Sequence, residues 1–275
     1  MILKSFSKIN LSINVARKLK NGLHDIHSYF CLVDVFDEIK IVKNNKKKDF
    51  VIFKGQFAKN IQKTNNSVLN TLKILRNKKV ISDYYSIIIK KKIPVYGGLG
   101  GGTSNAACLI KYFTKGRVNK NLFFSLEKII GSDLRLFFYN QGYLKNLKII
   151  KKTTKHNLNF LLVFPNIKCS TTKIYAKVKK FSRKSKFSKM SSKKKFINFL
   201  AHENNDLQSI VENKHPPIRN LINEISTKNG CYFSRMTGSG SVCYGVFRSD
   251  NSAKLALKKI KYNHPKYWLT VAKTI

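Results

Sequence analysis

The spacing of hydrophobic positions predicts a chain of interspersed strands and helices. Alternating or β-branched apolar residues indicate strands, and apolar residues three and four positions apart indicate helices. In the first half we expect strands at residues 11–15, 38–42, 50–53 and 85–89. We expect helices at residues 67–76, 104–113 and 122–130. The first half therefore contains both kinds of element, with strands concentrated at its beginning.

The second half repeats this mixture without a regular βαβ order. We expect helices at residues 217–226 and 252–260, and strands at residues 231–234, 242–247 and 268–272. A Lys/Ser-rich tract at 177–195 predicts a surface loop or an exposed helix. Interspersed elements favour an α+β fold with two layers per domain. We place the domain boundary near residues 151–155, which gives domains at 1–152 and 153–275.

One glycine-rich segment carries the clearest chemical signal. Five glycines lie between Gly97 and Gly102, and the hydroxyl residues Thr103 and Ser104 follow at the start of a predicted helix. Glycines allow positive φ and a close approach of the backbone to a ligand, and a helix N-terminus presents N–H groups and a positive dipole end. The segment therefore predicts a cradle for phosphate groups, because a flexible linker would not run directly into an apolar helix.

Two common phosphate-binding loops do not fit this segment. A Walker A loop requires a lysine before its Ser/Thr, and here Gly102 is followed directly by Thr103. A dinucleotide fingerprint counted from Gly98 requires glycine at the position of Thr103. Residues 94–106 instead resemble the ATP-binding motif of the GHMP kinases, P-x-x-G-G-L-G-G-G-[ST]-S-N-A.

Further motifs resemble the same superfamily, and within it the diphosphocytidyl-methylerythritol kinases. Lys8 lies in Ser-Lys-Ile-Asn-Leu, similar to their Ala-Lys-Ile-Asn-Leu, and Asn-Gly-Leu-His-Asp at 21–25 follows where they carry Asp-Gly-Tyr-His. Asp133 lies in Gly-Ser-Asp-Leu, which resembles their Gly-Ala-Asp-Val, and a second glycine loop lies at 236–241. Taken singly, these could be a surface lysine, a turn aspartate and a hairpin loop. Together they extend the resemblance from Lys8 to Phe247.

The resemblance implies both a fold and a reaction. The fold would have an N-terminal ribosomal-protein-S5-domain-2-like domain and a C-terminal ferredoxin-like domain, with a cleft between them. The reaction would be ATP-dependent phosphorylation of the 2-hydroxyl of 4-diphosphocytidyl-2-C-methyl-D-erythritol, in non-mevalonate isoprenoid biosynthesis. Asp133 would orient and receive the hydroxyl proton, while Lys8 would offset negative charge on the acceptor oxygen. Mg²⁺ would bridge the phosphates, with Ser104 as its protein contact.

The resemblance also implies which residues bind the two substrates. Those for ATP are Asn66, Lys91, Pro94, Gly97, Gly98, Leu99, Gly100, Gly101, Gly102, Thr103, Ser104 and Asn105. Those for the acceptor substrate are Asn10, His24, Thr172, Tyr175, Thr237, Gly238, Ser239 and Gly240. Asn66 and Lys91 fall where the family lines its adenine pocket, and Tyr175 falls in the segment that supplies an aromatic ring against cytosine.

Two positions depart from the family's pattern. Leu23 replaces the tyrosine that stacks on cytosine, and base stacking on an aromatic ring contributes about 1 to 3 kcal/mol. We therefore expect Tyr175 and His24 to carry more of the recognition. Arg135 stands where proline is usual, two residues after Asp133. A guanidinium there would favour the ionised aspartate or meet a substrate phosphate.

The charge of the chain raises alternative functions. Lys and Arg number 54 against 13 Asp and Glu, a net charge of +41, which could indicate an RNA-binding protein whose glycine loops are merely turns. The lysines are spread along the chain, as an A/T-rich coding sequence would give, and no RNP, KH or zinc-knuckle pattern is present. Another GHMP kinase, acting on homoserine, mevalonate or a sugar, is the second alternative. His24 and Tyr175 favour the cytidine substrate over these.

Composition also bounds the location and the partners. The 275 residues, 43% of them hydrophobic, can bury a sizeable core, and the five cysteines show no CxxC spacing. We expect buried free thiols in a reducing compartment. No secretory signal and no apolar run of about 18 residues is present. The expectation is a cytoplasmic enzyme with a small-molecule substrate, no requirement for nucleic acid or membrane, and a monomeric or weakly dimeric state.

Overall fold

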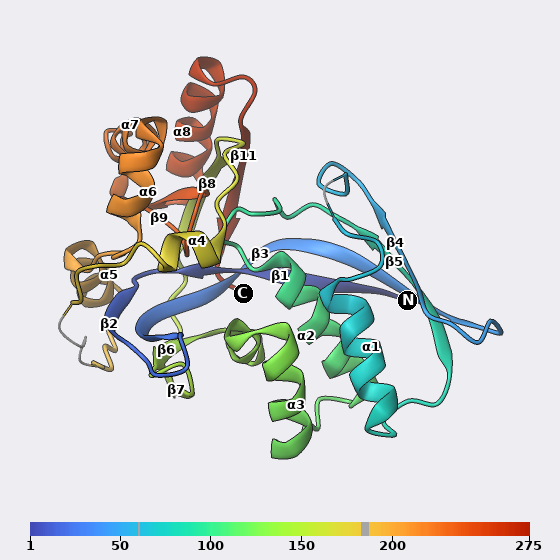
Figure 1. The fold of residues 1–275 in the computed structure, drawn as a ribbon. Helices are drawn as coiled ribbons and strands as arrows, with labels where there is room; N and C mark the ends of the chain where they lie inside the picture. The colour runs from blue at the N-terminus through green and yellow to red at the C-terminus, as the bar shows by residue number, and fades with distance from the viewer. Residues whose placement is uncertain (60, 183–186) are drawn as a thin grey trace. The chain divides into compact units, whose positions relative to one another are not determined.

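The computed structural model describes residues 1–59, 61–182 and 187–275 (Figure 1). These residues form two compact units. Unit 1 comprises Met1–Lys8, Val35–Val95 and Gly100–Phe138. Unit 2 comprises Ile9–Asp34, Tyr96–Leu99 and Tyr139–Ile275. Each unit is thus assembled from separated segments of the chain. The expected domain boundary at 152/153 stays a prediction.

Unit 1 contains a sheet in the order β4-β5-β3. Its strands are β4 (Phe50–Lys54), β5 (Tyr84–Lys90) and the second part of the long β3 (His24–Asn44). β4 and β5 are parallel, whereas β5 and β3 are antiparallel. The parallel pair is joined through helix α1 (Ser67–Asn77), because parallel neighbours need a crossover connection. Ile39 on β3 lies opposite Ile89 on β5, and both are fully buried.

The helices of unit 1 carry the end of the glycine-rich segment and Asp133. They are α1, α2 (Gly101–Phe113), α3 (Lys120–Ile130) and the 3₁₀ helix η1 (Ser132–Phe138). α1 packs against both α2 and α3, and η1 packs against α2 and α3. Leu72 and Leu75 of α1 and Leu109 of α2 are completely buried, so these helices turn apolar faces toward the interior of unit 1.

Unit 2 contains two antiparallel groups of strands. The first group comprises the first part of β3, β2 (Asn14–Lys18), β6 (Gln141–Lys145) and β7 (Ile149–Lys152). The second is a sheet in the order β11-β8-β10-β9. Its strands are β8 (Asn159–Phe164), β9 (Cys231–Met236), β10 (Cys243–Phe247) and β11 (Trp268–Lys273). β1 (Ile2–Asn10) passes from unit 1 into unit 2 at its last two residues.

In the described part of unit 2, five helices accompany this second sheet. They are α4 (Thr171–Tyr175), α5 (Lys193–His202), α6 (Gln208–Lys214), α7 (Pro216–Ser226) and α8 (Asp250–Asn263). α7 packs on β9 and β10, and α8 packs on β8 and β11. Their buried residues, among them Leu221 and Ile260, share a core with Leu161 and Val163 of β8. The succession β8, α7, β9, β10, α8, β11 gives a β-α-β-β-α-β unit of the ferredoxin type.

The α+β prediction is confirmed, and most expected elements are present. The strand expected at 11–15 is confirmed only at its last two residues, because β2 begins at Asn14. Leu11, Ile13 and Val15 are buried, as their alternation indicates, but residues 11–13 lie between β1 and β2. The N–H of Ile13 donates to the carbonyl of Asn204 instead of to a strand. The alternating pattern therefore predicted correctly which side chains are buried. It did not show that the backbone of residues 11–13 lies outside a strand.

Two further observations concern the remaining expectations. Among the described residues, no helix is both long enough and apolar enough to cross a membrane. The Lys/Ser-rich tract at 177–195 is irregular up to Ser192, where α5 is capped, and residues 183–186 of this tract lie outside the described residues.

Candidate active site

The glycine-rich segment ends in the N-terminus of α2. Gly100 is the N-cap and has a φ of 69°, in the left-handed region. A Cβ at Gly100 would lie 2.8 Å from Phe137 Cζ and 3.3 Å from Lys8 Cε, so only glycine fits there. Because the cap has no side chain, the first N–H groups of α2 have no side-chain acceptor. This helix start, beside Lys8, is suited to bind an anion.

Lys8 and Asp133 lie close together in unit 1. Lys8 Nζ is 3.5 Å from Asp133 Oδ2, although 124 residues separate them in the chain. The lysine side chain is 4% exposed, whereas the aspartate side chain is 47% exposed. The pair therefore combines a buried cation with a carboxylate that a ligand can reach, next to the start of α2.

Asp133 owes its position to the junction between α3 and η1. α3 ends at Gly131, and Asp133 is the second residue of η1. Arg135, which we expected near Asp133 or a substrate phosphate, has another partner. Its guanidinium forms two hydrogen bonds to Glu127 of α3, at 2.9 and 3.1 Å, and lies 4.8 Å from the ring centroid of Phe123. Arg135 thus fastens η1 to α3.

Ser104 and Asn105 of α2 face inward. Ser104 is 3% exposed, and its hydroxyl donates to the carbonyl of Phe6. The hydroxyl of Ser104 also lies 2.7 Å from Ser5 Oγ. Because Ser104 has given its only proton to Phe6, Ser5 must be the donor in the second bond. Asn105 Nδ2 donates to Ser5 Oγ at 2.9 Å, so β1 and α2 are fastened together here.

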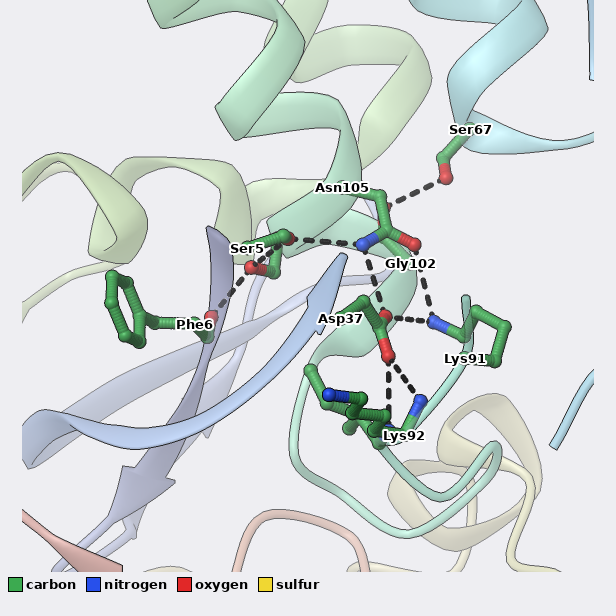
Figure 2. Close-up of polar contacts among 10 residues, drawn as sticks. Ser5, Phe6, Asp37, Ser67, Lys91, Lys92, Gly102 and Asn105 are labelled. Carbon is green, nitrogen blue, oxygen red and sulfur yellow. Dashed lines mark hydrogen bonds and ion pairs between the residues drawn. The ribbon is translucent and has the colours of Figure 1, made fainter. Parts of the chain in front are cut away.

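Asn66 and Lys91 also make contacts within the protein. Asn66 is the N-cap of α1, and its Oδ1 accepts from the N–H groups of Val68 and Leu69. The ammonium of Lys91 is buried, and it donates to Asp37 and to Asn105 (Figure 2). Both polar groups are therefore committed to protein partners. Their expected place in an adenine pocket stays a prediction.

In unit 2, the first part of the glycine loop packs against the second glycine loop. The N–H of Val242 donates to the carbonyl of Gly97 at 3.1 Å. Gly98 has a φ of 79°, and a Cβ there would lie only 2.3 Å from the carbonyl oxygen of Thr237. The two loops are thus in backbone contact. The hydroxyl of Thr237 accepts from the N–H of Asn10 at 2.9 Å, which places these expected substrate residues side by side.

Side chains brace the second glycine loop from behind. Asn205 Nδ2 donates to the carbonyls of Met236 and Gly238, each at 2.8 Å. The hydroxyl of Ser239 lies 2.9 Å from that of Thr171, at the start of α4. Thr172, the next residue, is exposed. The loop is therefore fixed to the segments before α6 and at α4.

The rings of His24 and Tyr175, two expected substrate residues, lie against each other. Their ring centroids are 5.2 Å apart, with an interplanar angle of 35°. Burial, and secondarily the charge of Lys18, lower the pKa of His24 below its usual value of 6.5. His24 is therefore neutral at pH 7. Leu23, the preceding residue, is 49% exposed.

Sequence reasoning missed three residues that support the start of α2. Ser5 and Asp37 are buried and bonded to Asn105, and Ser67 donates to the carbonyl of Gly102 at 2.8 Å. Asp37 had only a weak signal, since it is one of few acids in the chain but has Asp34 and Glu38 as neighbours. Ser5 and Ser67 carried none.

Comparisons with known proteins place this geometry in a family. Residues 193–266 match the family model of the GHMP kinases C-terminal region. The 4-diphosphocytidyl-2-C-methyl-D-erythritol kinase of Pelagibacter ubique is 35% identical, over 99% of this chain and 98% of that protein.

Solved structures agree on the fold. A crystal structure of 4-(cytidine 5'-diphospho)-2C-methyl-D-erythritol kinase superposes with a TM-score of 0.76 at 19% identity, covering 99% of each chain. The mevalonate kinase of Methanococcus jannaschii gives a TM-score of 0.65 at 17% identity, covering 100% of this chain and 98% of that one.

The 35% identical full-length relative, together with the C-terminal family model and the fold, defines a GHMP kinase, an enzyme that uses ATP. More narrowly, the full-length similarity shows that the chain belongs to the 4-diphosphocytidyl-2-C-methyl-D-erythritol kinase family.

Proposed function

We propose that the chain transfers the γ-phosphoryl group of ATP to the 2-hydroxyl of 4-diphosphocytidyl-2-C-methyl-D-erythritol, in non-mevalonate isoprenoid biosynthesis. The observation that carries the proposal is the Lys8–Asp133 pair beside the N-terminus of α2, in a chain 35% identical over its length to a kinase of that name.

The residues of unit 1 have distinct tasks in this reaction. The N–H groups at the start of α2 bind phosphate oxygens. The carboxylate of Asp133 orients the acceptor hydroxyl and accepts its proton, and the ammonium of Lys8 offsets the negative charge on the acceptor oxygen. Phosphoryl transfer passes through a loose transition state, so positioning and charge stabilisation dominate over strong base catalysis. No phosphoenzyme is required.

Few side chains of this protein could bind Mg²⁺ directly. Among the described residues there is no group of three His, Cys, Asp or Glu side chains that could hold a metal ion. Ser104 keeps one free lone pair on a buried hydroxyl, and Asp133 offers an exposed carboxylate. Mg²⁺ commonly keeps several waters and binds through substrate phosphates, which suits so sparse a site. It would neutralise charge on the β- and γ-phosphates.

Unit 2 supplies the residues for the cytidine substrate. His24 and Tyr175 offer two rings for the base, and the amides of the second glycine loop offer donors for the diphosphate. We further propose a cytoplasmic location and a monomeric or weakly dimeric state. Five free cysteines, three of them buried, support a reducing compartment.

A substrate panel tests the proposal against the other GHMP kinases. With ATP held constant, we expect phosphorylation of 4-diphosphocytidyl-2-C-methyl-D-erythritol and negligible phosphorylation of homoserine, mevalonate or galactose. Preferential phosphorylation of one of the other three acceptors would reject the assigned substrate. ATP turnover with none of the four would reject the proposed reaction.

A further inference from the structure

The carboxylate of Asp37 lies at the centre of a buried network in unit 1 (Figure 2). Asp37 is fully buried, and four donors surround its two oxygens. Oδ1 accepts from the backbone N–H groups of Lys92, at 2.8 Å, and Ile93, at 3.0 Å. Oδ2 accepts from the ammonium of Lys91 and from Nδ2 of Asn105, the latter at 3.0 Å. These bonds fill the acceptor capacity of a carboxylate.

The four donors come from both ends of the glycine-rich loop. Lys92 and Ile93 immediately precede the loop, whereas Asn105 is the fifth residue of α2, which follows it. The same two ends also touch directly, because a Cβ on Gly101 would lie 3.1 Å from Ile93 Cγ2. One carboxylate therefore holds the entry and the exit of the loop at a fixed separation.

The network continues to β1 on its far side. Asn105 Nδ2 uses its second hydrogen to donate to Ser5 Oγ, and Ser5 in turn bonds to Ser104. The amide oxygen of Asn105 accepts from the Lys91 ammonium at 3.1 Å. Each polar side chain is thus satisfied by the others, which fixes the rotation of α2 about its axis.

We propose that Asp37 is a positioning residue for ATP, because it sets the geometry in which the first N–H groups of α2 face the phosphates. This inference rests on the proposed function and assigns to that site a residue that itself touches no substrate. Asp37 also neutralises Lys91, whose ammonium lies 3.3 Å from the position of a Cβ on Gly101. The positive end of α2 therefore stays available to the ligand without a second, uncompensated buried charge.

The test is Asp37→Asn, with ATP affinity measured by calorimetric titration and with the KM of each substrate measured separately. Asparagine keeps one acceptor for Lys92 and Ile93 but turns an NH₂ group toward the donors Lys91 and Asn105. A displacement of about 1 Å at a reacting centre costs roughly 10²-fold in rate. We expect kcat/KM for ATP to fall by about that factor, and the KM of the cytidine substrate to stay within about twofold of its wild-type value.

A matched control separates positioning from loss of stability. Asp49 of unit 1 is also a largely buried aspartate, paired with Arg76 at 2.7 and 3.0 Å and accepting from the N–H of Tyr85. Its partner Arg76 lies in the last turn of α1, whereas Gly102 meets α1 at its first residue, Ser67. Asp49→Asn should lower the Tm and leave ATP affinity unchanged.

Ser5→Ala provides a milder test if Asp37→Asn does not fold. It removes only the hydroxyl that supports Asn105 and Ser104, and we expect a several-fold weaker ATP affinity with a smaller loss of Tm than in Asp37→Asn. Wild-type ATP affinity in both Asp37→Asn and Ser5→Ala, or in Ser5→Ala alone where Asp37→Asn is unfolded, would overturn the role of Asp37. A wild-type protein that binds no ATP would instead reject the proposed function.

Discussion

Single residues in this chain differ in function according to how their polar groups are satisfied. The charges of Lys91, Asp37 and Arg135 are already paired with protein groups, so they organise the structure around a ligand. Asp133 is half-exposed, and its carboxylate lies 3.5 Å from the ammonium of Lys8. The residue best suited to meet a substrate is therefore the one whose carboxylate the fold leaves accessible.

His24 provides a prediction on the pH dependence of stability. Its pKa is lowered below 6.5 by burial, so the folded protein binds this proton less tightly than the unfolded chain does. The stability contributed by the neutral ring is present above pH 6.5 and is lost as pH falls through the lowered pKa. We expect His24→Phe to lose less unfolding free energy than wild type between pH 7.5 and pH 5, by about 1.4 kcal/mol for each unit of pKa shift.

Denaturant titrations at the two pH values measure this difference. His202, an exposed histidine at the end of α5, provides the control, and His202→Phe should follow the wild-type profile. An identical pH dependence in His24→Phe and wild type would contradict the assigned burial effect.

At the level of elements, periodicity located most helices but not how they begin. The helix expected at 104–113 starts at Gly101 instead, inside the glycine-rich segment. The sequence did not indicate this start, because glycine has poor helix propensity and adds nothing to an apolar pattern. β3 spans His24–Asn44, yet only 38–42 were predicted, since buried Asp25, His27 and Ser28 interrupt its apolar pattern. A local hydrophobic pattern cannot show which polar residues will be buried with hydrogen-bond partners from distant parts of the chain.

The contact between the two glycine loops gives a prediction at this scale. Gly98 and Gly116 have nearly equal φ values, 79° and 76°, but a Cβ on Gly116 meets nothing within 4 Å. Gly116→Ala should therefore cost only the backbone strain, about 1 to 2 kcal/mol. Gly98→Ala should cost more, because its Cβ would clash with the carbonyl of Thr237.

Unfolding free energies and turnover of the two variants check this prediction. We expect Gly98→Ala to lower both quantities, and Gly116→Ala to lower only the first. Equal destabilisation by the two substitutions would show that the packing of Gly98 on the second loop contributes nothing.

For the whole molecule, the sequence motifs predicted more than composition did. The net charge of +41 pointed toward polyanions, whereas the motifs pointed toward a GHMP kinase, the class that fold and family membership now establish. The proximity of Lys8 and Asp133 was expected only through resemblance to a family, since nothing local to either residue encodes it. The Asp37 network could not be predicted, because it depends on how four segments that are separate in the sequence pack together.

The most direct test of the proposed chemistry is steady-state turnover of ATP and 4-diphosphocytidyl-2-C-methyl-D-erythritol by wild type, Asp133→Asn and Asp250→Asn. Asp250 is a matched control, since it is 56% exposed and paired with Lys254 on α8. We predict that Asp133→Asn lowers kcat by about 10² to 10⁴-fold, while Asp250→Asn stays within about twofold of wild type. Equal kcat values for Asp133→Asn and wild type would contradict the catalytic assignment.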